Sequence, residues 1–123
     1  VRLVGSEMCI RDSSSSDIGM VAFDADNGAI WFGKNGTWSA SATQTEIENG
    51  TTTNAAWTGL TNASGYVASF STESSTMNLN FGNGYLGTTA VSSAGNNASG
   101  FGIFEYDVPA GFTALCTKGI NSF

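Results

Sequence analysis

The chain has 123 residues, enough for one domain or part of one. Its net charge is −6 and it holds only four Lys and Arg residues, which argues against nucleic acid as a partner because phosphate binding needs clustered cations. No apolar run approaches the ~20 residues that a membrane-spanning helix requires. The absence of histidine excludes Ser-His-Asp and Cys-His nucleophiles as well as histidine zinc sites.

The N-terminal segment matches a non-biological sequence. Residues 3–13 are identical to one reading frame of a transposase adapter used in DNA library preparation. We therefore expect residues 1–13 to be an adapter-derived artefact outside the fold, and the domain to be residues 14–123 of a gene that extends further upstream. Without Cys9, Cys116 is the only cysteine, so the chain offers no intrachain disulfide from which to infer the redox compartment.

Residues 17–36 predict a hairpin of two strands, joined by one tight turn and closed by a second. Asn27-Gly28 and Asn35-Gly36 mark the two turns. Asn-Gly pairs are typical of type I′ turns, because both central residues of that turn need positive φ and these two residue types tolerate it best.

The predicted core follows from alternation along two segments. Between the two Asn-Gly turns, Ile30 and Phe32 share one face of a strand and Trp31 lies on the other. Residues 76–81 alternate in the same way and predict a half-buried antiparallel strand. We predict one inter-sheet core of five side chains: Ile30, Phe32, Met77, Leu79 and Phe81.

Between these strands the chain is polar, with one short apolar segment. Residues 39–54 contain a single large aliphatic side chain, Ile47, and are predicted to be a long surface loop. Residues 55–60 resemble an anchor segment with Trp57 and Leu60 turned inward.

The C-terminal half predicts further short strands. Residues 65–82 are expected to form a second hairpin that turns at residues 71–75, and residues 84–100, rich in Ser, Ala, Gly and Asn, to form a loop. Residues 101–107 are expected to be a last strand. Short alternating strands between Gly, Asn and Ser turns indicate an all-β protein, an antiparallel β-sandwich.

Two parts of the chain resemble SPRY (B30.2-like) domains. The first is the hairpin, in which an apolar strand ending at Asp24 is followed by a turn and by an aromatic, Lys and Asn-Gly close. The second is the tail, which runs from Asn80-Phe81-Gly82 through an aromatic-x-Tyr strand to residues 109–118. The resemblance covers residues 17–37, 57–84 and 101–118.

The resemblance implies a concanavalin-like, SPRY-type sandwich that lacks its N-terminal strands. It further implies a non-catalytic binding module in a phage or environmental viral protein, as a virion structural or tail-associated part located on the virion or outside the cell. No cofactor is implied. The partner would be a protein or glycan surface, contacted through variable loops at one end of the sandwich.

Aromatic side chains beside loops are the candidate binding residues. Trp38, Trp57 and Tyr85 could each stack on a sugar or grip a protein ligand. Core packing is the competing interpretation, and for Trp57 it is the default. A chain with no ligand, serving as a structural domain, is a third hypothesis.

Two pairs or groups of carboxylates are candidate sites. Asp24 opens a stretch that fails the calcium-loop pattern, because Ala29 and Asn35 occupy the positions that need Gly and Glu, so it predicts a turn and no metal site. Glu46 and Glu48 would share one face of an extended strand, as in a concanavalin-like glycanase. A solvated loop pair is favoured, and no catalytic residue is assigned.

Overall fold

The computed structural model describes residues 16–61, 65–67, 69, 76–93 and 100–115. The chain divides into two compact units, Val1–Ala63 and Ser64–Phe123, and each is described by itself. The expectations for residues 1–13 and for the turn at 71–75 lie outside the described residues, as does Cys116.

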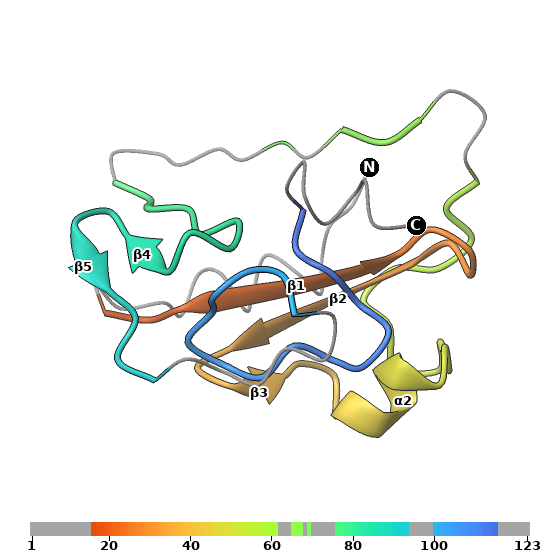
Figure 1. Ribbon diagram of the computed structural model, residues 1–123. Coiled ribbons are helices and arrows are strands. Elements are labelled where there is room, and N and C mark those ends of the chain that lie inside the picture. The colour runs from red at the N-terminus through yellow and green to blue at the C-terminus, as the bar shows by residue number, and fades with distance from the viewer. Residues whose placement is uncertain (1–15, 62–64, 68, 70–75, 94–99, 116–123) are drawn as a thin grey trace. The chain divides into compact units, whose positions relative to one another are not determined.

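The first unit is built on the predicted hairpin. β1 (Gly19–Asp24) and β2 (Ala29–Lys34) pair antiparallel over their whole length, from Gly19 opposite Lys34 to Asp24 opposite Ala29. The short β3 (Thr37–Trp38) pairs with the end of β2 and completes a sheet of order β1-β2-β3 (Figure 1). The hairpin prediction is confirmed.

The Asn-Gly pairs at the two ends of β2 form different turns. Asn35 and Gly36 both have positive φ, 50° and 83°, as a type I′ turn requires. In the β1–β2 connection only Gly28 has positive φ, at 60°, so the type I′ prediction for Asn27-Gly28 is wrong. The reason is the length of the connection: four residues separate the strands, and the Asp24 side chain accepts the N–H groups of the second and third, Asp26 and Asn27.

The buried face of the sheet is the one that holds Trp31. Trp31 is 1% exposed and lies opposite the buried Ala22, whereas Ile30 and Phe32 are half-buried and lie opposite the exposed Phe23 and Val21. The prediction that Ile30 and Phe32 mark the core face is therefore wrong in this unit. Both faces of β2 are apolar, so alternation alone could not rank them.

The predicted long loop at residues 39–54 contains a short helix, α2 (Gln44–Glu48). Thr43 caps its N-terminus, and the pair Thr43 and Glu46 forms a capping box in which each side chain bonds the other's backbone N–H. Ile47 is fully buried. The loop prediction is wrong here because a cap and one buried side chain suffice for a single helical turn.

The predicted anchor segment follows α2 and holds the first unit together. The Ile30 N–H donates to the Trp57 carbonyl oxygen over 3.1 Å, and the Leu60 N–H donates to the Gly28 carbonyl oxygen over 3.0 Å. Trp57 and Leu60 are both half-buried. The segment therefore docks on β2 and on the β1–β2 turn through main-chain bonds.

The second unit has less regular structure. β4 (Tyr85–Leu86) and β5 (Thr89–Ala90) form a small antiparallel hairpin inside the segment predicted to be a loop. Its two connecting residues, Gly87 and Thr88, have positive φ at Gly87 alone, which is the pattern of a type II′ turn.

Two predicted strands of the second unit are absent as strands. Residues 76–81 are in neither a strand nor a bridge, and Met77, Leu79 and Phe81 are 40–43% exposed. Residues 101–107 contribute one parallel bridge, from Ile103 to Asn83. The expected second hairpin at 65–82 therefore does not form in the part of it that the structure describes, and the prediction that Met77, Leu79 and Phe81 are core side chains is wrong because each is exposed.

At the level of class, the protein is mostly strands in antiparallel sheets with almost no helix. Within the residues the structure describes, no helix is long and apolar enough to cross a membrane.

Candidate functional site

The three candidate aromatic residues differ in how much of each ring is available. Trp38, in β3, is 8% exposed and its ring edge lies over Gly33, where an added Cβ would meet the Trp38 Cε3 atom at 3.1 Å. Trp57 is half-buried and bridges β2. Tyr85, in the second unit, is 48% exposed. Among the three candidates, Tyr85 presents the largest free ring surface.

Tyr85 is held on a defined backbone. Its N–H donates to the Oδ1 atom of Asn83 over 3.2 Å, and the Val91 N–H donates to the Gly84 carbonyl oxygen over 3.0 Å at the same, open end of the hairpin. Asn78 lies beside the β4–β5 turn, where a Cβ on Gly87 would meet its amide group at 3.0 Å. An exposed tyrosine thus lies on a small hairpin, and the side-chain amides of Asn78 and Asn83 lie beside that hairpin.

Two glycine-containing segments, around Gly82 and Gly102, pack closely beside this hairpin. The Ile103 N–H donates to the Gly82 carbonyl oxygen, and the Asn80 Nδ2 atom donates to the Ile103 carbonyl oxygen, each over 3.0 Å. A Cβ on Gly82 would lie 2.8 Å from the Cα atom of Gly102. The two segments approach so closely that neither glycine leaves room for a side chain.

Ser92 and Glu105 tie the end of the hairpin to the following segment. The Ser92 N–H donates to the Glu105 Oε2 atom over 2.6 Å, and the Ser92 hydroxyl donates to Oε1. Both bonds stabilise the charged carboxylate and so lower the pKa of the Glu105 carboxyl below its usual value. The bond from the Ser92 hydroxyl has the larger effect. The sequence offered no local signal for this contact because thirteen positions separate the two residues.

The carboxylates of the first unit shape its backbone. Asp24 Oδ1 accepts the N–H groups of Asp26 and Asn27 over 2.9 and 3.0 Å, and its Oδ2 accepts the Asn27 side-chain amide over 2.6 Å. This is a turn, as predicted. Among the described residues, no group of three or more His, Cys, Asp or Glu side chains could hold a metal ion.

Glu46 and Glu48 do not form the carboxylate pair considered for a glycanase. They lie two positions apart in α2, and side chains at that spacing do not share a helix face. Glu46 accepts the Thr43 N–H and the Asn54 amide, over 2.8 and 2.9 Å, while Glu48 accepts the Gln44 amide over 3.1 Å. The extended geometry that would align the two groups is absent.

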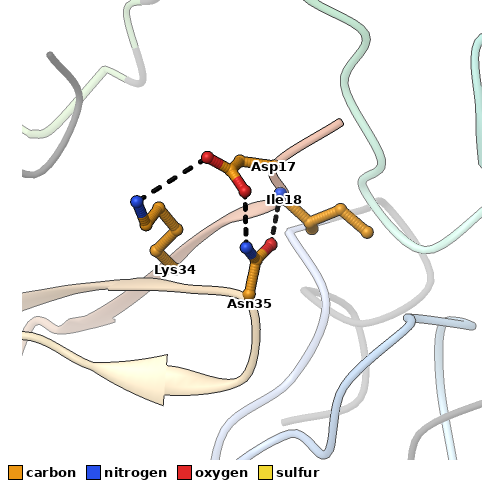
Figure 2. Close-up of polar contacts among 4 residues, drawn as sticks. All are labelled: Asp17, Ile18, Lys34 and Asn35. Carbon is orange, nitrogen blue, oxygen red and sulfur yellow. Dashed lines mark hydrogen bonds and ion pairs between the residues drawn. The ribbon is translucent and has the colours of Figure 1, made fainter. Parts of the chain in front are cut away.

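A polar cluster that sequence reasoning missed closes the open end of the β1–β2 hairpin (Figure 2). We call it the Asn35 clasp: Asp17, Ile18, Lys34 and Asn35. The Ile18 N–H donates to Asn35 Oδ1 over 2.8 Å, the Asn35 N–H donates to the Ile18 carbonyl oxygen over 2.9 Å, and Asn35 Nδ2 donates to Asp17 Oδ1 over 2.6 Å. Lys34 Nζ lies 3.6 Å from the other Asp17 oxygen.

The clasp extends the ladder by one position beyond the last strand pair. The side chain and the backbone of Asn35 together bond both main-chain groups of Ile18, as the next residue of a strand would do. Its function is therefore structural.

No family model matches the chain, and no curated protein and no solved structure matches it either. Function must therefore be argued from the chemistry of the described side chains. Most of the polar side chains described above bond the chain's own backbone, whereas the Tyr85 side chain is exposed.

Proposed function

We propose that the chain is a non-catalytic recognition module that binds a protein or glycan surface through the β4–β5 hairpin, with Tyr85 as the principal contact. The observation that supports this best is the exposure of Tyr85, 48%, on a hairpin whose open end is held by hydrogen bonds. A planar ring beside amide groups suits both ligand classes, since the ring stacks on apolar surface while amides bond hydroxyls or main-chain groups.

The proposal retains the SPRY-type, concanavalin-like sandwich and the virion or tail-associated setting that the resemblance implies. Support comes from the β1–β2 hairpin, which forms at the residues that carry the resemblance, and from the Asn35-Gly36 turn that joins β2 to β3. A shared fold does not by itself assign a ligand, so the binding surface is proposed from Tyr85 and not from the family.

Trp57 and Trp38 take different parts in this proposal. Trp57, half-buried in the first unit, is a secondary contact candidate. Trp38 is buried, so its replacement by Ala would act on packing and would be a poor probe of binding.

The test is a binding screen of the whole chain against immobilised glycans and against cell-surface protein preparations. Tyr85→Ala is expected to reduce affinity by about thirtyfold, the effect of losing an interfacial hot spot of about 2 kcal/mol. Tyr85→Phe should retain most of the affinity if stacking dominates. Tyr66→Ala is the matched control, because Tyr66 is a similarly exposed tyrosine of the second unit, 40%.

Two results would overturn the proposal. One is binding that Tyr85→Ala leaves unchanged while circular dichroism shows an intact fold. The other is turnover of any polysaccharide that disappears in the double variant Glu46→Gln/Glu48→Gln, which would establish the glycanase hypothesis instead.

A further inference from the structure

Four Asn-Gly pairs occur in the chain, at Asn27, Asn35, Asn49 and Asn83. Such pairs are chemically labile, because glycine lacks a side chain that would keep its backbone nitrogen away from the preceding asparagine amide. In a folded chain the reaction is suppressed where the amide is held by hydrogen bonds or where the backbone cannot rotate. The four pairs differ sharply in these respects.

Two of the four amides are held by carboxylates. The Nδ2 atom of Asn27 donates to Asp24 Oδ2, and that of Asn35 donates to Asp17 Oδ1, each over 2.6 Å. The Asn35 amide is fixed a second time, since its Oδ1 atom accepts the Ile18 N–H. Bonds of this length to a charged acceptor are among the stronger ones in proteins.

The pair at Asn83 is restrained mainly through its backbone. Asn83 bridges Ile103, its Oδ1 atom accepts the Tyr85 N–H, and Gly84 is buried with Ile103 side-chain atoms 3.2 Å from where its Cβ would be. Rotation at this pair would break the bridge to Ile103.

Asn49 is different. Its side chain is exposed and makes no hydrogen bond with any residue that the structure describes. It is the C-cap of α2, where two main-chain bonds restrain the pair: Asn49 N–H to the Thr45 carbonyl oxygen and Gly50 N–H to the Ile47 carbonyl oxygen, each over 3.0 Å. Gly50 also packs against the Asn27 side chain, whose Nδ2 atom would lie 2.7 Å from a Cβ on Gly50. A helix of one turn frays readily at its end, and fraying frees the Gly50 nitrogen.

We propose that Asn49 is the principal site of spontaneous deamidation in the folded chain. The Gly50 nitrogen loses its proton to solvent base and bonds to Cγ of Asn49. The bond from Cγ to Nδ2 then breaks, and ammonia leaves with a proton from solvent. Water opens the resulting five-membered imide at either carbonyl carbon, giving aspartate or isoaspartate. One water is consumed and one ammonia is released.

The product changes the end of α2. A new carboxylate appears next to Glu48 at the C-terminal end of the helix, where the helix dipole disfavours negative charge. Isoaspartate also lengthens the main chain by one bond at the C-cap. Both products are expected to loosen the last turn around the buried Ile47.

The experiment incubates the whole folded chain in mildly alkaline buffer made with heavy-oxygen water and follows each pair by peptide mapping. The same incubation in denaturant supplies the unrestrained rate of each site. In the folded chain Asn49 should keep most of its unrestrained rate. Asn27 and Asn35 should be slowed by roughly tenfold or more, the factor that one hydrogen bond to a charged group implies.

A variant tests the reason for the ranking. Asp17→Ala removes the carboxylate that holds the Asn35 amide, so deamidation at Asn35 should accelerate toward its unrestrained rate while Asn49 is unchanged. The proposal is overturned if Asn27, Asn35 or Asn83 reacts as fast as Asn49 in the folded chain. It is also overturned if Asp17→Ala leaves the Asn35 rate as it was and circular dichroism shows an intact fold.

Discussion

The two units differ in what holds the backbone. In the first, six-residue strands pair along their whole length, and side chains complete the frame: Asp24 orders one turn and Asn35 closes the other end. In the second, the strands are two residues long. Isolated main-chain hydrogen bonds, such as those that Gly82 and Gly84 accept, connect its segments. The comparison shows that an alternating pattern yields a strand only when a partner strand is available, because the backbone groups must be paired.

Residues 29–34 and 76–81 illustrate this. Both alternate, but β2 has β1 on one side and β3 on the other, whereas residues 76–81 form neither a strand nor a β-bridge. The difference predicts that stability is concentrated on the buried face of β2.

The largest expected effect is the loss of stability when the buried face of β2 is truncated. Trp31→Ala should cost about 3–5 kcal/mol of unfolding free energy, because it empties a site that is 1% exposed. Phe81→Ala should cost much less, since the Phe81 ring is 40% exposed and loses correspondingly little buried area. Chemical denaturation followed by circular dichroism measures both changes.

The milder Trp31→Phe provides a second measurement in case Trp31→Ala does not fold. An equal loss of stability in Trp31→Ala and Phe81→Ala would contradict the face assignment and restore the predicted Phe81 core.

A smaller effect is expected at Gly28. An added Cβ would lie 2.4 Å from the Leu60 carbonyl oxygen, and φ is +60°, so Gly28→Ala should cost about 1–3 kcal/mol through overpacking in addition to left-handed strain. Gly59→Ala is the matched control, with φ of +71° and open space around the Cβ, and should show the strain alone, about 1–2 kcal/mol. Equal losses would mean that the docked 55–60 segment moves away freely.

The smallest effect concerns pH. Burial opposes ionisation of Asp24 and is the largest single influence, but the bonds from the Asn27 amide and from the N–H groups of Asn27 and Asp26 together outweigh it, so the pKa lies below 3.8. A lowered pKa in the folded chain means stabilisation that is present above the unfolded pKa and lost as the pH falls through the folded value. Asp24→Asn should therefore flatten the acid side of the stability curve.

Asp26→Asn is the control, because Asp26 contributes only its main-chain N–H to the turn. A stability curve unchanged by Asp24→Asn at acid pH would show that the turn forms equally well around an uncharged side chain.

The sequence was informative where structure is local. The hairpin at residues 17–36 was predicted because alternation and an Asn-Gly turn lie within a few residues of each other. The helix was missed although its signals were present: Thr43 and Glu46 have capping-box spacing, and Ile47 is the one aliphatic side chain nearby. A single turn contains too little periodicity to be recognised.

Which face of β2 is buried, and how Tyr85 is presented, depend on residues that are distant in the sequence. Trp31 and Ile30 are equally plausible core residues until it is known what packs on each face. Tyr85 was named as a binding candidate from its position beside loops, but the hairpin that presents it was missed, although Gly87 at the first turn position was a usable signal. Its role in binding stays a prediction.

The placement of the aromatic residues has an optical consequence. The three tryptophans, Trp31, Trp38 and Trp57, all belong to the first unit, while the three tyrosines belong to the second. Red-edge excitation selects indole over phenol, so intrinsic fluorescence reports on the first unit from within the intact chain. Absorbance of the phenol rings reports mainly on the second. The protein thus contains a natural pair of spectroscopic probes that can show, without any label, whether its two units melt together or in turn.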